Sequence, residues 1–441
     1  MRLLVVLTLG AVLMRAADRR VFPYAFDQYD LPNGLRLITV PTDYPNVVAV
    51  YIVVQAGSRN EVEPGKSGYA HLFEHMMFRG TKNYPPARYE AVLKAAGASS
   101  NAYTTDDHTA YHTTFSKEDL ETILAMEADR FQNLEYSEDV FRTEALAVLG
   151  EYNKNSADPL NKLYEVLRDT AFDRHTYKHT TMGFLKDIQD MPNNYGYSRL
   201  FFERYYRPEY TTIIVAGDVK PEQTRRLVDK YWAGWNKGGF RVEIPQEPPP
   251  AGPRRNHVSW PAPTLPWVVV AFRGPAYSDA RLDKAALDLI AFMGFAENSE
   301  LYQKLVIREQ KVDILEAENP NRVDPYLFTV WARVKKESDV EQVRDEILAT
   351  LERFRSVPTD GARLDRAKRH LRYRFVLSLR DSEAIAATVA RYVALRRTPE
   401  TIDRLYALYE KVTPADIKAV AEKYFTERGR TIVTLAGGKA R

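Results

Sequence analysis

Two histidines and a glutamate stand close together in the segment His71-Leu72-Phe73-Glu74-His75. The apolar residues around them are spaced as in a buried helix, on which residues three and four positions apart share a face. His71 and His75 therefore project side by side, and Glu74 lies beside them. Two neutral imidazoles in this arrangement can hold one zinc ion, and a free carboxylate next to the open coordination position can activate its water.

The spacing is that of the H-x-x-E-H pattern, the reverse of the H-E-x-x-H zinc-binding pattern. Three fixed positions in five are weak evidence alone, since about one chain in a hundred of this size and histidine content would match by chance. The structural alternative is a pair of buried histidines whose polar atoms are satisfied by a carboxylate. The remainder of the sequence has to separate these two interpretations.

The composition is that of a globular chain with more than one domain. Its 441 residues exceed what one hydrophobic core usually holds. The 62 basic and 59 acidic residues give a net charge of only +3, whereas nucleic-acid-binding proteins usually carry a marked basic excess. We therefore expect no nucleic-acid partner. The chain has no cysteine, so disulfides are impossible and any metal site must use His, Asp or Glu.

The first 17 residues have the pattern of a secretory signal peptide. Arg2 precedes an apolar run from Leu3 to Met14, and the small residues Ala16 and Ala17 follow. As a helix this run rises about 18 Å, well short of the roughly 30 Å of a bilayer core. We therefore expect residues 1–17 to be a signal peptide and the mature protein to be periplasmic or secreted. A buried N-terminal helix or an organelle presequence is the alternative, and no later run is long enough to span a membrane.

A second helix is predicted from near Glu138 to beyond Glu151, and it carries acidic residues. Glu144 and Glu151 are seven positions apart, so they lie two helical turns apart on almost the same face. Acidic residues with this spacing usually belong to a solvated face. Here Val148 and Leu149 indicate that the helix is at least partly packed, so a carboxylate on it could reach inward and complete a His-His-Glu zinc site.

His175 and His179 are further candidate ligands. Their neighbours include Thr, Tyr and Gly183, which are typical of a loop. We therefore interpret both histidines as structural.

Local patterns predict several elements around the motif and in the second half of the chain. A β-branched run at 47–55 indicates a buried strand, and residues 99–115, rich in Thr and Tyr, indicate a strand pair or one long strand. The position of the latter in a sheet does not follow from the sequence, but an edge strand there could bind an extended peptide by strand addition. Long helical patterns occupy 283–292 and 364–392.

The chain divides into two halves with similar element patterns. A Pro-rich segment at 237–257 is typical of a semi-rigid linker between residues 18–236 and residues 258–441. The sequence at 423–437 resembles that at 204–217, where a β-branched strand ends in glycine. We therefore predict an α+β fold of two homologous halves, each an antiparallel-rich sheet covered by helices. H-x-x-E-H occurs only in the first half, so only that half could hold the metal.

Residues beyond the pentapeptide extend it to a much more specific signature. Its members are Gly68, His71, Glu74, His75, Phe78, Gly80, Thr81, Asn101, Ala102, Thr104, Asp107, Thr109, Tyr111 and Glu151. In these positions, and over nearly its whole length after the leader, the chain resembles the pitrilysin, insulinase and mitochondrial processing peptidase family of zinc metallopeptidases. Members of the processing-peptidase type show the same separation of 76 positions between His75 and Glu151.

The resemblance implies a zinc metalloendopeptidase whose two halves close like a clam shell and whose substrates are peptides or unfolded segments. One zinc ion per chain would be held by His71, His75 and Glu151. Glu74 would take a proton from the attacking water and pass it to the leaving amine. Glu144 matches a second acidic position of the family and would support the site by orienting a ligand. A plain surface carboxylate is the alternative for Glu144.

The resemblance also implies substrate contacts, and one of them departs from the family pattern. Asn101 and Ala102 would lie on the strand that pairs with the substrate backbone. Self-sufficient members carry, in the metal-free half, an Arg followed seven residues later by a Tyr. Arg308 fits the first position, but Leu315 stands at the second and Val312 replaces the usual glycine between them.

This departure leads us to expect a heterodimer, in which a metal-free homologous subunit supplies the missing substrate contacts, or a homodimer. Arg308 could equally be an ordinary surface residue. The rival class is a non-catalytic scaffold or peptide-binding member of the same fold, such as the core subunits of respiratory complexes. Those subunits have generally lost zinc ligands, whereas all three are present in this chain.

Overall fold

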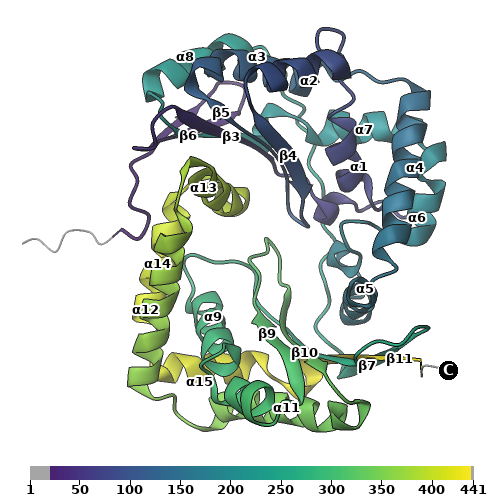
Figure 1. The fold of residues 1–441 in the computed structure, drawn as a ribbon, viewed down its shortest axis with the longest axis vertical. Helices are drawn as coiled ribbons and strands as arrows, with labels where there is room; N and C mark the ends of the chain where they lie inside the picture. The colour runs from purple at the N-terminus through teal and green to yellow at the C-terminus, as the bar shows by residue number, and fades with distance from the viewer. Residues whose placement is uncertain (1–19, 439–441) are drawn as a thin grey trace, which may run out of the picture.

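The computed structural model describes residues 20–438, which fold into two α+β halves (Figure 1). Each half is built on one β-sheet, with six strands in the N-terminal half and five in the C-terminal half. The predicted signal peptide, residues 1–17, lies outside the described residues. Within residues 20–438, no helix is both long enough and apolar enough to cross a membrane.

The first sheet has the strand order β1-β2-β6-β3-β5-β4. Its strands are β1 (Asp27–Asp30), β2 (Arg36–Pro41), β3 (Val47–Val54), β4 (Ser99–Thr104), β5 (Thr109–Ser116) and β6 (Thr211–Gly217). The β-branched run forms the central strand β3, which is buried on both faces. The predicted strand pair is β4 and β5, joined antiparallel, and β4 is an edge of the sheet.

Helices of the N-terminal half cover one face of this sheet. The helices of this half are α1 (Tyr69–Met76), α2 (Pro86–Ala95), α3 (Leu120–Asn133), α4 (Glu138–Asn155), α5 (Pro159–Ala171), α6 (Leu185–Asp190), α7 (Tyr195–Tyr205) and α8 (Pro221–Trp232). Val50 and Ile52 of β3 share one core cluster with Phe73 of α1, Ile123 of α3 and Val228 of α8. This core therefore fixes α1, which carries the histidines, against the sheet.

The C-terminal half repeats the plan with the strand order β7-β11-β8-β10-β9. Its strands are β7 (Arg254–Trp260), β8 (Trp267–Arg273), β9 (Val312–Glu318), β10 (Leu327–Val334) and β11 (Arg430–Gly437). Its helices are α9 (Leu282–Phe295), α10 (Glu300–Tyr302), α11 (Val340–Ser356), α12 (Gly361–Ser378), α13 (Ser382–Arg396), α14 (Glu400–Lys411) and α15 (Pro414–Tyr424). A π-helical segment, Gln303–Arg308, follows α10 directly.

The second face of each sheet is covered by a helix from the other half. Helix α13 packs Ile385 and Val389 against β3 and β6 of the first sheet. Conversely, α5 packs Leu163 and Leu167 against β7 and β11 of the second sheet, where Figure 1 shows it beside the lower half. Because these apolar faces would otherwise meet water, each half depends on the other to complete its cores.

Two predicted segments differ in the structure. The helical pattern at 364–392 forms two helices, α12 and α13, with a break at 379–381. Asp381 lies in that break, and its side chain caps α13 by accepting a hydrogen bond of 2.7 Å from Ala384 N–H. The last residues of the predicted linker, 254–257, already belong to β7, because they pair in parallel with β11 near the end of the chain. The other domain limits stay a prediction.

Candidate metal centre

Helix α1 begins at a left-handed glycine and is capped by a buried carboxylate. Gly68 has a φ of +93°, and a Cβ there would come within 2.9 Å of the Met182 carbonyl oxygen, so the position favours glycine. The backbone N–H groups of Gly68 and Ala70 donate to the two oxygens of Glu61 at 2.8 and 2.7 Å. Glu61 therefore anchors the helical turn that carries His71, at the end where backbone N–H groups have no acceptor within the helix. Burial raises the pKa of Glu61, and the two backbone hydrogen bonds oppose that rise.

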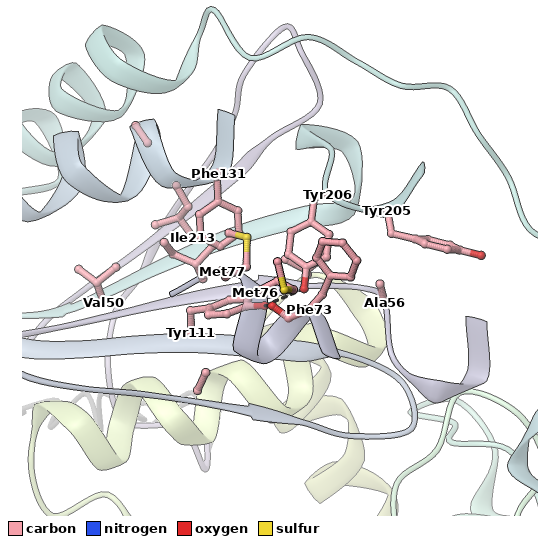
Figure 2. Close-up of a cluster of buried hydrophobic side chains, with 14 of the residues drawn as sticks. Val50, Ala56, Phe73, Met76, Met77, Tyr111, Phe131, Tyr205, Tyr206 and Ile213 are labelled. Carbon is pink, nitrogen blue, oxygen red and sulfur yellow. Dashed lines mark hydrogen bonds between the residues drawn. The ribbon is translucent and has the colours of Figure 1, made fainter. Parts of the chain in front are cut away.

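The rest of α1 is held in the main core of the N-terminal half (Figure 2). Phe73, Met76 and Met77 are fully buried there. The Tyr111 hydroxyl donates to the Phe73 carbonyl oxygen at 3.0 Å and lies 2.7 Å from the Tyr206 hydroxyl. Because Phe73 lies between the two histidines in the sequence, this hydrogen bond fixes the turn that carries both of them.

His71, His75 and Glu151 bring three potential ligand atoms together. Glu151 Oε2 lies 3.6 Å from His71 Nε2 and 3.5 Å from His75 Nε2. Ligand atoms around a tetrahedral zinc ion are about 3.4 Å apart when each bond is about 2.1 Å. Burial, together with the neighbouring His75, lowers the pKa of His71 to about 4, so its imidazole is neutral near pH 7, as a metal ligand must be. Both distances from Glu151 therefore suit a zinc ion, all three ligand atoms lie within 4.8 Å of one another, and His71 has the protonation state of a metal ligand.

Glu144 lies on the opposite side of the His75 ring from Glu151. Its Oε2 is 3.6 Å from His75 Nδ1, and its Oε1 is 2.9 Å from Arg79 Nε. Contact with Glu144 raises the pKa of His75. Burial alone would raise the pKa of Glu144, but His75 and Arg79 outweigh it, so this pKa is lowered and the group stays ionised. Glu144 is thus placed to orient the imidazole and to leave His75 Nε2 free for a metal.

Glu74 is placed as a free carboxylate beside the three ligand atoms. The Thr104 hydroxyl donates to Glu74 Oε2 at 2.6 Å, and burial raises the pKa of Glu74. A cavity of about 410 Å³ opens here, and His71, Glu74, Thr104 and Glu151 all line it. A carboxylate with a raised pKa that faces a cavity beside a metal site has the character of a general base.

The predicted substrate-binding residues lie in two separate places. Asn101 and Ala102 are on β4, at the edge of the first sheet, two and three positions before Thr104. Arg308 ends the π-helical segment of the C-terminal half, where its side chain is exposed and lines neither the cavity beside Glu74 nor any other described one. The structure therefore does not bring Arg308 together with the metal-site residues.

The two further histidines lie outside the metal cluster, where they support the loops around it. His175 Nε2 is 2.9 Å from Asp324 Oδ2, and His175 Nδ1 accepts a hydrogen bond from Tyr177 N–H. His179 Nδ1 is 2.9 Å from the Thr180 carbonyl oxygen and 3.7 Å from Glu61. Both positions agree with the structural interpretation.

Three supporting residues have no role assigned to them from the sequence: Glu61, Thr104 and Tyr111. Thr104 and Tyr111 belong to the family signature, and that signature was their only signal. Glu61 is an acidic residue seven positions before Gly68. Nothing in this spacing indicates that the loop between them folds back and brings the Glu61 side chain to the start of α1. Its role depends on the fold of the intervening loop.

The fold and this cluster together are typical of peptidases with an H-x-x-E-H motif. Two models of one peptidase family match the chain: "Insulinase (Peptidase family M16)" over residues 36–184 and "Peptidase M16 inactive domain" over residues 197–371. The chain belongs to the insulinase family of peptidases, M16. The prediction of an α+β fold with two homologous halves in a clam-shell arrangement is confirmed.

Relatives cover most of the chain. It is 28% identical to zinc protease PqqE of Helicobacter pylori over 92% of this chain and 91% of that protein. It is 26% identical to a probable mitochondrial-processing peptidase subunit beta of Arabidopsis thaliana, over 90% of this chain and 76% of that one. The crystal structure of a protease from Helicobacter pylori matches with a TM-score of 0.86 at 28% identity, covering 94% of this chain and 99% of that one. These names support peptidase function in general.

Proposed function

We propose that this protein is a zinc metalloendopeptidase that hydrolyses peptides or unfolded polypeptide segments. The observation that carries the proposal is the convergence of His71, His75 and Glu151 beside the cavity that Glu74 lines. Zinc bound there would supply a Lewis acid that polarises the peptide carbonyl and lowers the pKa of water. The names of the relatives, which include zinc proteases, support the same reading.

The chain's own residues would divide the remaining work. Glu74 takes a proton from water as the water attacks the peptide carbonyl, then delivers it to the leaving amine. Thr104 holds one Glu74 oxygen, so the other oxygen is the one that handles the proton. Glu144 and Arg79 hold the His75 ring in a fixed orientation. The edge of β4, with Asn101 and Ala102, pairs with the backbone of an extended substrate.

Replacing the proposed base separates binding of the metal from hydrolysis. Glu74→Gln should retain zinc, since it removes no ligand, and should lose hydrolysis of a quenched fluorogenic peptide library. Glu90→Gln, an exposed residue of α2, is the matched control. Retained hydrolysis in Glu74→Gln would place the base elsewhere. Less than about one-tenth equivalent of zinc in carefully prepared wild-type protein would contradict the whole proposal.

The second candidate is a non-catalytic scaffold or peptide-binding protein of the same fold. It is favoured by the missing tyrosine seven residues after Arg308. A scaffold would bind peptides or partners without turnover. Zinc content and peptide hydrolysis, measured on the same preparation, distinguish the two candidates.

We also propose that the active form contains a second subunit, either a metal-free homologue or a second copy of this chain. The support is the position of Arg308, away from the metal cluster, together with a relative that is named as a subunit of a processing peptidase. Sedimentation and assays with and without a co-expressed homologue test this. Strong activity from a monomeric preparation would count against a required partner.

We also propose that residues 1–17 direct export from the cytoplasm and that the mature protein is periplasmic or secreted. The support is the short apolar run after Arg2 and the small residues that follow it. N-terminal sequencing of the protein from its native cells should find a start near residue 18. An intact Met1 on the abundant form would contradict export by this signal.

A further inference from the structure

A second cavity adjoins the one that contains the metal-site residues. It has a volume of about 630 Å³ and lies between α5 and the strands β9 and β10 of the C-terminal half. Asn161 and Tyr164 of α5 line both cavities. A peptide that reaches the ligands His71 and Glu151 can therefore extend along α5 and place a side chain in this second cavity.

The apolar walls of this cavity are aromatic. Tyr164, Trp267, Tyr326 and Trp331 line it, and the rings of Tyr164 and Trp331 are 6.1 Å apart. The Tyr164 hydroxyl is 3.0 Å from the Tyr326 hydroxyl, which ties the wall contributed by α5 to the wall contributed by the C-terminal half. Faces of this kind attract the alkyl stem and the charge of a lysine or arginine side chain.

Two carboxylates complete the cavity from strand β9. Glu316 and Glu318 both line it, and as alternate residues of one strand they point to the same side. In the antiparallel register, Glu316 stands opposite Trp331 and Glu318 opposite Thr329. Both side chains reach solvent, and among residues 20–438 neither forms an ion pair with a basic side chain. Two carboxylates therefore face the cavity with no basic side chain at ion-pair distance among residues 20–438.

The nearby arginines are already paired with other acids. Arg322, which lines the cavity, contacts the buried Asp106 through Nη2 at 2.8 Å, and Arg333 contacts Asp313 through Nε at 2.9 Å. Glu316 and Glu318 thus lack a direct ion pair that a ligand would have to displace. Partial burial and the charge of Glu316 raise the pKa of Glu318, while Arg322 and Trp331 oppose that rise. A bound cation would lower this pKa further.

We infer that this cavity is a specificity pocket that binds a lysine or arginine side chain of the peptide substrate. The aliphatic stem lies between the aromatic walls, and the cationic head meets Glu316 and Glu318. The volume accommodates one long side chain. The inference rests on the proposed peptidase function, because it treats the adjoining metal site as the place where that peptide is cut.

A paired peptide series tests the pocket. Quenched peptides carry one lysine at successive positions around the cleaved bond, and each is matched to a peptide with norleucine, which keeps the stem and lacks the charge. At one position lysine should raise kcat/KM by about tenfold or more, as expected for a charge-assisted contact. In the double variant Glu316→Gln/Glu318→Gln the ratio of kcat/KM for the lysine peptide to kcat/KM for the norleucine peptide should fall to within about twofold.

Controls separate failure of the pocket from failure of the peptidase. Glu337→Gln, an exposed carboxylate outside both cavities, should keep the lysine preference. Two results would contradict the proposed pocket without affecting the proposed peptidase function. One is a wild-type enzyme that shows no preference for lysine at any position, and the other is a preference that persists in the double variant. A preference for aromatic or aliphatic side chains at the mapped position would also overturn the pocket, by assigning the cavity to an apolar residue.

A binding measurement tests the pocket without turnover. The Glu74→Gln protein should bind a fluorescent lysine peptide about tenfold more tightly than its norleucine partner, and the added Glu316→Gln/Glu318→Gln changes should remove the difference. Absence of hydrolysis in every wild-type assay would overturn the proposed function alone. Equal binding of the two peptides would overturn the pocket alone.

Discussion

Three glutamates surround the same two histidines, and each has different neighbours. Glu151 faces the Nε2 atoms of both imidazoles. Glu144 faces the far side of His75 and is paired with Arg79. Glu74 contacts the hydroxyl of Thr104 and faces the cavity. At the scale of single residues, these different surroundings are the reason why we propose Glu151 as a ligand, Glu144 as a support and Glu74 as a base.

Removing the charge of Glu144 should weaken zinc binding without abolishing it. In Glu144→Gln the His75 ring loses its charged partner at Nδ1, and losses of this kind typically reduce metal affinity by about 10- to 100-fold. Competition with a fluorescent chelator measures the change. Glu138→Gln, at the exposed start of the same helix α4, is the control and should bind zinc as the wild type does. Glu144 is buried in the structure rather than on the surface, so unchanged affinity in Glu144→Gln would limit its role to the ion pair with Arg79.

The pH dependence of hydrolysis should report on Glu74. Its pKa is raised by burial, and the hydrogen bond from Thr104 opposes that rise by stabilising the ionised form. A base works only when ionised, so kcat/KM falls as the pH drops through this pKa. Thr104→Val removes the opposing hydrogen bond, raises the pKa further and should move the acid limb to higher pH. Thr104→Ser keeps the hydroxyl, so the acid limb of its kcat/KM profile should lie at the same pH as in the wild type. An unmoved limb in Thr104→Val would show that another group controls it.

At the scale of elements, the local sequence predicted those features that depend on neighbouring residues. The β-branched pattern predicted β3, and the helical spacing around His71 and His75 predicted a buried α1. The edge position of β4 did not follow from local patterns, because it depends on which strands pair across the sheet. The helical pattern at 364–392 did not predict the break at 379–381, where Asp381 caps α13. Spacing therefore predicted that His71 and His75 lie side by side, whereas it did not predict which residues hold their helix.

Glu61 should prove important for stability because it caps the helix that carries the ligands. Glu61→Ala would leave the buried N–H groups of Gly68 and Ala70 without an acceptor, which costs about 2–4 kcal/mol of unfolding free energy in all. Urea denaturation of the metal-free protein measures this. Glu61→Gln keeps one acceptor oxygen and should lose less. Equal stability of Glu61→Ala and the wild type would show that water replaces the carboxylate.

At the scale of the whole molecule, the halves are joined by exchanged helices and by one buried ion cluster. Asp106, in the loop between β4 and β5, contacts Arg168 of α5 at 2.6 Å and Arg322 of the C-terminal half at 2.8 Å. Asp106 and Arg168 are almost completely buried. Burial opposes ionisation of Asp106, but the two guanidinium groups outweigh it and hold its pKa below the usual range. The cluster lies beside the cavity that Arg322 lines, so it positions the C-terminal half against the metal-bearing one.

Asp106→Asn should therefore destabilise the protein by about 3–5 kcal/mol, because it removes the counter-charge of the buried Arg168 and of the partly buried Arg322. A carboxyl group with a lowered folded-state pKa contributes its stability above the unfolded pKa of about 4 and loses it as the pH falls through the folded value. The difference in unfolding free energy between wild type and Asp106→Asn should thus be constant from neutral pH down to about 4 and shrink in stronger acid. Urea denaturation at a series of pH values measures it. Asp345→Asn, at an exposed pair on α11, should change stability by less than about 0.5 kcal/mol.

The Asp106→Asn variant should also show faster amide hydrogen exchange in residues 319–326 if the cluster holds the halves together. Unchanged exchange there would limit the role of the cluster to local stability.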